Sequence, residues 1–215
     1  MQFEMLNKTV GFIAKRASGK SCMLKWLVSL HKEQFDKIIV FCPTETISPF
    51  YEELTTKEFI FDEYNDEYIL KLIDKMTMIN SNKPKEKKKN VMVLLDDCMS
   101  DTDFLHQGKG LQRLFARGRH LNITVVLCAQ YLNSCPPLCR NNFDYVICGM
   151  LNRMSVELLC NEYLSGDLEK KDFIKTYHRT TQDYGFLLIN CCSIKDSADL
   201  NNIYGQIKTP IEYIK

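Results

Sequence analysis

The chain has 215 residues, of which 45% are hydrophobic and 26% are charged, and its formal net charge at pH 7 is +1. This balance excludes a global attraction to nucleic acid or membranes, so such a partner would need a local patch. No apolar run reaches the roughly 18 residues of a membrane-spanning helix, and the chain starts without an apolar signal segment. We expect one domain over residues 1–215, not secreted, with its ten cysteines reduced.

The first predicted elements are a strand over Thr9–Ala14 and a helix over Lys20–Leu30, joined by a turn of small residues. The turn matches the end of the phosphate-binding pattern G-x-x-x-x-G-K-[S/T]. Backbone N–H groups at a helix N-terminus favour an anion. We therefore expect Lys20 to bridge the β- and γ-phosphates of a nucleotide and Ser21 to offer its hydroxyl to Mg²⁺. The predicted nucleotide-binding residues are Lys15, Arg16, Ala17, Ser18, Gly19, Lys20, Ser21 and Cys22.

Ala14 stands where the phosphate-binding pattern has its first glycine. A left-handed conformation at this position would cost alanine about 1–2 kcal/mol that glycine avoids, whereas a negative φ would make alanine harmless. The alternative interpretation is a strand, turn and helix in which the Gly-Lys-Ser sequence is accidental. The apolar face of the helix is predicted from Met23, Leu24, Leu27 and Leu30.

The next elements are a buried strand over Lys37–Cys42, a short strand over Phe59–Phe61 and a helix over Glu67–Ile79. Residues 80–90 are polar and basic, so we expect an exposed loop there. Solvation is the simplest role for this loop, and contact with DNA phosphates is the alternative. Its lysines are Lys83, Lys85, Lys87, Lys88 and Lys89.

Two carboxylates follow an apolar strand predicted over Val91–Leu95. In a parallel sheet this strand end would lie beside the phosphate-binding turn. We therefore expect Asp96 to hold Mg²⁺ and Asp97 to polarise the attacking water, with an acidic turn as the alternative. The strand over Ile123–Ala129 ends at Gln130, which we expect to sense the γ-phosphate or hold that water, unless it only caps the strand.

Strands that alternate with helices predict an α/β fold with a mostly parallel central sheet flanked by helices. One strand or more should lie between the strand before the phosphate-binding turn and the strand before the paired carboxylates. That order is typical of P-loop NTPases of the additional-strand, RecA/FtsK-like type. The tail over about residues 195–215 carries no clear pattern. The remaining predicted elements are helices at 110–117, 154–163 and 168–177 and strands at 143–148 and 184–190.

The chain resembles the DNA-packaging ATPases of poxviruses, other large DNA viruses and virophages, within the FtsK/HerA-like superfamily. The resemblance rests on residues 15–21, 94–97, 118–124 with Gln130, and 136–141. It implies an ATPase that uses ATP and Mg²⁺ to translocate double-stranded DNA into a preformed capsid. The implied partners are further copies in a ring of five or six subunits and a capsid portal or vertex protein. The implied location is the viral factory in the host cytoplasm, or the virion.

The chain departs from this family at Ala14 and Ala17, where glycine is usual or frequent. These departures favour one alternative, a nucleotide-binding scaffold or switch with weak hydrolysis. The size of the chain also suits a second alternative, a small P-loop phosphotransferase, for which the sequence offers no recognisable substrate site.

A ring-forming ATPase also needs an arginine finger that stabilises transition-state charge in a neighbouring subunit. We expect Arg119 and Arg140 to be the first candidates, both at the carboxyl edge of the sheet. Arg117 ranks behind them, and Lys15 and Arg16 are the alternatives for action within one subunit.

Overall fold

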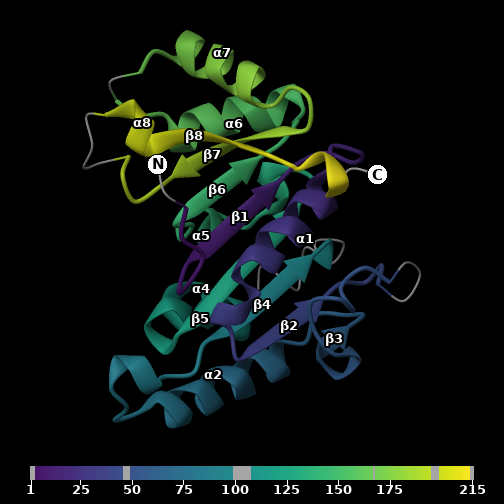
Figure 1. Cartoon of the computed structure of the whole chain (residues 1–215). Coiled ribbons are helices and arrows are strands. Elements are labelled where there is room, and N and C mark those ends of the chain that lie inside the picture. Colours follow the sequence, from purple (N-terminus) through teal and green to yellow (C-terminus); the bar gives the residue numbers. More distant parts are fainter. Residues whose placement is uncertain (1–2, 46–48, 99–107, 167, 195–198, 214–215) are drawn as a thin grey trace.

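In the part of the chain that it describes, the computed structural model contains an eight-stranded sheet with helices on both faces (Figure 1). The structure describes residues 3–45, 49–98, 108–166, 168–194 and 199–213. The strands are β1 (Thr9–Ile13), β2 (Lys37–Phe41), β3 (Ile60–Phe61), β4 (Val91–Asp96), β5 (Ile123–Ala129), β6 (Tyr145–Cys148), β7 (Gly185–Asn190) and β8 (Tyr204–Lys208). The α-helices are α1 (Lys20–His31), α2 (Asp66–Asn80), α4 (Lys109–Arg117), α5 (Pro137–Arg140), α6 (Arg153–Tyr163), α7 (Lys170–Thr180) and α8 (Leu200–Ile203).

The strand order is β3-β2-β4-β5-β1-β6-β7-β8. The first six strands in this order pair in parallel, and β7 and β8 pair antiparallel to their neighbours. The expected mostly parallel α/β sheet is confirmed. Because β5 lies between β1 and β4, the expected additional strand is also present.

Side chains alternate between two apolar cores, as the two-residue period of a strand requires. On one face Phe12, Met92 and Val126 pack with the buried side of α1. On the other face Ile13, Val93 and Val125 pack with helices α2, α4, α5, α6 and α7. Helices on both faces explain why the parallel strands are continuous hydrophobic runs without polar alternation.

The prediction for the face of α1 was wrong at one position. Met23, Leu24 and Leu27 are buried as expected, but Leu30 is 58% exposed. Leu30 lies in the last turn of α1. The tail predicted to lack a pattern also contains structure, because β8 pairs antiparallel with β7 at the sheet margin.

The parallel strands give the sheet two chemically different edges. At the carboxyl edge, where these strands end, lie the turn between β1 and α1 and the residues that follow β4 and β5. At the amino edge, where they begin, the backbone N–H of Asp36 donates to the Asn90 carbonyl and that of Val91 to the Asn122 carbonyl. The basic loop at residues 80–90 and the short helix η5 (Gly118–Leu121) therefore lie at the amino edge.

Candidate active site

The turn between β1 and α1 is held by the ends of both neighbouring strands. The backbone N–H of Ala14 donates to the Ala129 carbonyl at 3.1 Å, and that of Lys15 donates to the Met150 carbonyl at 2.8 Å. Within the turn, the Ser18 hydroxyl donates to the Lys15 carbonyl at 2.6 Å. These bonds hold the start of α1 over the carboxyl edge, with the first N–H groups of the helix available to an anion.

The left-handed conformation that was considered for Ala14 is found at Ala17 instead. Ala17 has φ of 59° and Gly19 has φ of 80°, whereas Ala14 is not among the described non-glycine residues with positive φ. A Cβ atom on Gly149 would lie 2.8 Å from the Ala14 Cβ, so the missing side chain of Gly149 makes room for the Ala14 methyl group. The alanine at position 14 is therefore accommodated, and the one at position 17 is strained.

Lys20 lies between the two carboxylates that follow β4. Its Nζ atom is 3.2 Å from Asp96 Oδ1 and 3.6 Å from Asp97 Oδ1. Burial alone would lower the pKa of the Lys20 ammonium, but the charges of Asp96 and Asp97 outweigh burial and raise this pKa above the usual lysine value. Lys20 is therefore a charged group whose present partners are the carboxylates themselves.

The second oxygen of Asp96 accepts a hydrogen bond from a residue that the sequence did not single out. The hydroxyl of Tyr51 donates to Asp96 Oδ2 at 2.6 Å, and Tyr51 is buried. Burial, reinforced by the charge of Asp96, raises the pKa of the Tyr51 phenol well above its usual value, so the phenol stays a donor. The Tyr51 backbone is fixed in turn, because its N–H donates to Glu45 Oε1 at 2.6 Å. Tyr51 lies in the irregular connection after β2, where no periodicity marks a functional side chain.

Gln130 and Asp97 lie side by side at the ends of β5 and β4. The Gln130 amide donates to Asp97 Oδ1 at 3.2 Å and to Oδ2 at 3.4 Å. Asp97 has a left-handed backbone with φ of 55°, so the chain turns sharply after β4. The two consecutive carboxylates consequently make different contacts, Asp96 toward Tyr51 and Asp97 toward Gln130.

A cavity of about 290 Å³ joins these groups. It combines the N-terminus of α1, a buried ammonium, two carboxylates and a side-chain amide, which are suited to a polyphosphate and a hard cation. Its lining contains all the predicted nucleotide-binding residues except Ser18, together with Thr44, which was not predicted. The lining residues are Lys15, Arg16, Ala17, Gly19, Lys20, Ser21, Cys22, Thr44, Asp96, Asp97 and Gln130.

The predicted position of the two arginines at the carboxyl edge was wrong. Arg119 and Arg140 line a separate cavity of about 460 Å³ with Asp144, which accepts hydrogen bonds from the N–H and hydroxyl of Thr9 at the start of β1. Both arginines precede parallel strands, and residues that precede a parallel strand lie at the amino edge. The physical reason is the direction of the chain, which enters a parallel strand at the amino edge of the sheet.

The two arginines also differ in their contacts. Arg140 is mostly buried, and its Nε atom donates to Glu162 Oε1 at 2.8 Å while Nη1 donates to the Cys135 carbonyl at 2.6 Å. Arg119 is mostly exposed and makes a long ion pair of 3.8 Å with Asp144. The guanidinium of Arg140 therefore supports local packing, and that of Arg119 faces solvent.

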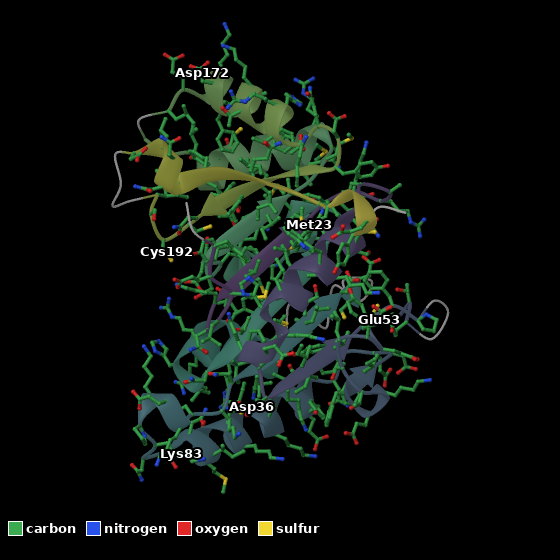
Figure 2. All side chains as sticks on the ribbon, viewed as in Figure 1. Met23, Asp36, Glu53, Lys83, Asp172 and Cys192 are labelled. Atoms are coloured by element: carbon green, nitrogen blue, oxygen red, sulfur yellow. The ribbon has the colours of Figure 1, made fainter. Side chains whose placement is uncertain are left out.

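The basic loop lies at the amino edge as well, away from the 290 Å³ cavity. Figure 2 shows Lys83 at the lower left and Cys192 at the left of the view, on the side where the parallel strands begin. Lys89 pairs with Asp36 at 2.6 Å, and the Asn80 side chain holds the loop by accepting from the Lys89 backbone N–H. The other predicted lysines, Lys83, Lys85, Lys87 and Lys88, are exposed or partly exposed.

All ten cysteines are free thiols. Cys128, at the end of β5, is fully buried, and burial together with the nearby Asp96 raises the pKa of its thiol well above the usual value. Burial likewise raises the pKa of Cys139 to about 12. These thiols are packing groups in their protonated form. None of the described helices is long and apolar enough to cross a membrane.

The strand order and the turn at the carboxyl edge define the fold as the P-loop NTPase fold of the additional-strand type. Comparison with known sequences makes the assignment more specific. The family model described as "Poxvirus A32 protein" matches residues 3–202, and the chain belongs to this family.

Relatives occur in other large DNA viruses. Protein 075L of Invertebrate iridescent virus 6 is 31% identical over 181 residues, which cover 83% of this chain and 68% of 075L. Protein L437 of Acanthamoeba polyphaga mimivirus is 26% identical over 156 residues, which cover 68% of this chain and 55% of L437. The chain thus spans about two thirds of the length of 075L and little more than half of the length of L437.

Solved structures share the fold at low sequence identity. The DNA-packaging ATPase B204 of Sulfolobus turreted icosahedral virus superposes with a TM-score of 0.69 at 15% identity, covering 96% of this chain and all of B204. The conjugation coupling protein TcpA of pCW3, solved with ATPγS, gives a TM-score of 0.63 at 16% identity, covering 97% of this chain and 61% of TcpA.

Proposed function

We propose that this chain is the ATPase of a viral motor that moves double-stranded DNA into a preformed capsid. The observation that carries the proposal is the cavity that joins Lys20, Ser21, Asp96, Asp97 and Gln130 in a member of the poxvirus A32 family. The B204 protein of a second virus, Sulfolobus turreted icosahedral virus 2, shares this fold, is described as a genome-packaging NTPase and was solved with AMPPCP and with ATPγS.

In the proposed cycle, the phosphates of the incoming nucleotide replace Asp96 and Asp97 as the ionic partners of Lys20. The N–H groups of the turn and the Lys20 ammonium bind the β- and γ-phosphates. Asp96 and Asp97 then no longer contact the positive charge of Lys20, which they share in the nucleotide-free protein. Ser21 and Asp96 offer the hydroxyl and carboxylate oxygens that Mg²⁺ prefers, and the bound ion would neutralise phosphate charge. Asp97, held by the Gln130 amide, then orients the attacking water.

The proposed assembly is a homo-oligomeric ring that docks on a capsid portal or vertex protein, in the viral factory or the virion. Ring interfaces are head-to-tail, so two different surfaces of the same chain meet. Arg119 is exposed and lies on a different surface from its own cavity, as a head-to-tail contact with a neighbour's nucleotide requires. Arg140 is a weaker candidate because Glu162 and the Cys135 carbonyl already bind its guanidinium.

The deciding experiment measures ATP hydrolysis with and without linear duplex DNA. We expect Mg²⁺-dependent hydrolysis that duplex DNA stimulates and that Lys20→Ala abolishes, since this variant removes the cation of the cavity. A rate of ATP hydrolysis that does not change when DNA is added would contradict the proposed translocase. ATP binding without detectable hydrolysis would favour a nucleotide switch.

A further inference from the structure

A tyrosine that no motif marks lies directly against the phosphate-binding turn. A Cβ atom placed on Gly19 would lie 2.9 Å from Cδ1 of the Tyr184 ring. Tyr184 is 47% exposed although it is large and apolar, so its ring covers Gly19 on one side and meets solvent on the other. Figure 1 shows the connection between α7 and β7, which carries this residue, beside the turn that follows β1.

The backbone under Tyr184 is held in a conformation that tyrosine rarely adopts. Asp183 has φ of 51° and Tyr184 has φ of 56°, and the N–H of Gly185 donates to the Gln182 carbonyl at 2.8 Å. Two successive positive φ values form a turn that normally takes Asn or Gly. A Cβ atom on Gly185 would lie 2.2 Å from the Thr180 carbonyl, so the end of α7 fixes this turn. Such conformations cluster at ligand-binding sites, where the surrounding structure enforces them.

The strand order places Tyr184 at the nucleoside end of the site. Asp97 and Gln130 follow β4 and β5, which lie on one side of β1, and in the proposed function they face the γ-phosphate. Tyr184 precedes β7, which lies beyond β6 on the other side of β1. A nucleotide with its γ-phosphate toward β4 and β5 therefore extends toward β6 and β7.

The lining of the 290 Å³ cavity favours a site for the base outside it. Its lining residues are charged, polar or small, with no aromatic side chain on which a base could stack, and Tyr184 is not among them. The phosphates fill such a cavity, and the base then lies beyond Gly19. Half-exposed Met150, whose carbonyl accepts from the Lys15 N–H, adds apolar surface on the same side.

We propose that the Tyr184 ring is the platform on which the base of the bound nucleoside triphosphate stacks. The inference rests on the proposed nucleotide site and assigns its base-binding residue. A half-exposed ring offers a π-face to any base, so it supplies affinity for the nucleoside without adding to phosphate binding.

The test compares ATP with inorganic tripolyphosphate, which lacks the nucleoside, by titration calorimetry. We expect Tyr184→Ala to weaken ATP binding about five- to 150-fold, as removal of one stacking partner does, and to leave tripolyphosphate binding unchanged. Tyr184→Phe keeps the π-face and should bind ATP like the wild type. The matched control is Tyr131→Ala, because Tyr131 is also 47% exposed but follows Gln130, on the γ-phosphate side.

Three results would overturn the inference. Equal losses for ATP and tripolyphosphate in Tyr184→Ala would mean that the ring only supports Gly19. Unchanged ATP affinity in Tyr184→Ala, or an equal loss in Tyr131→Ala, would place the base elsewhere. If the wild-type protein bound neither ligand, the proposed nucleotide site itself would fail, which distinguishes that failure from an error about Tyr184. Thermal melts of each variant check that the fold is intact.

Discussion

At the scale of single residues, the charge of Lys20 explains how the site is stable without a ligand. A buried ammonium is costly unless carboxylates lie close to it, and Asp96 and Asp97 fill that need. In the same arrangement, the ammonium of Lys20 balances the negative charge of both carboxylates. Phosphate oxygens offer Lys20 an equivalent set of acceptors, so the ligand exchanges one set of ionic contacts for another.

Because Ala17 is strained and Ala14 is not, we expect replacement of each by glycine to change the free energy of unfolding in opposite directions. Ala17→Gly should raise the free energy of unfolding by up to about 1 kcal/mol, because the relief of a left-handed alanine exceeds the added flexibility of the unfolded chain. Ala14→Gly should lower the free energy of unfolding by about 1 kcal/mol or more, because it adds flexibility and removes a buried methyl group packed against Gly149. Urea denaturation of the nucleotide-free protein measures both, and a loss of stability in Ala17→Gly would refute the strain.

At the scale of elements, the basic loop is separated from the cavity by the length of the parallel strands. Its lysines can therefore be changed without touching the catalytic groups. Replacing the four lysines not paired with Asp36 should weaken duplex DNA binding and flatten its salt dependence, by up to about 0.9 in slope for each DNA phosphate that is no longer neutralised. Hydrolysis without DNA should stay the same. The substitutions are Lys83→Gln, Lys85→Gln, Lys87→Gln and Lys88→Gln.

A control for this prediction is available at the far end of the molecule. The exposed lysines Lys170, Lys171 and Lys175 on α7 change the net charge without changing the basic loop. If their replacement by Gln flattened the salt dependence as much, the effect would come from overall charge. An unchanged slope in the loop variant would assign residues 80–90 to solvation alone.

The elements near the site were predictable to different degrees. The strands β1 and β4 and the helix α1 follow from continuous apolar runs beside recognisable turns, and their order in the sheet followed from the motif at Asp96 and Asp97. Strand β8 was missed because Gly205 and Gln206 interrupt any alternation of polar and apolar side chains. Tyr51 lies in a connection without periodicity, and Tyr184 stands at the first position of the last predicted strand. Only the folded backbone brings Tyr51 to Asp96 and Tyr184 to Gly19. The arginines were misplaced because the direction of the chain at the sheet edge was overlooked.

At the scale of the whole molecule, a head-to-tail ring predicts that two inactive variants complement each other. Arg119→Ala subunits keep an intact cavity, and Lys20→Ala subunits keep an intact Arg119. We expect each variant alone to be inactive and mixed rings to regain part of the hydrolysis, because some interfaces pair a complete cavity with an arginine. Hydrolysis is measured across mixing ratios, with Arg113→Ala, on the exposed side of α4, as a control that stays active alone. Normal hydrolysis by Arg119→Ala alone would exclude action across the interface.

The position of β1 in the middle of the sheet also constrains how the protein is made. Its pairing partners are β5, in which Val125 lies opposite Thr9, and β6, in which Tyr145 lies opposite Val10, so both leave the ribosome more than a hundred residues later. At about 5–20 residues per second, β1 waits on the order of ten seconds with both edges unpaired. An unpaired apolar strand invites association with other chains. Yield during synthesis should therefore depend on chaperones that cover the nascent chain until β5 is complete.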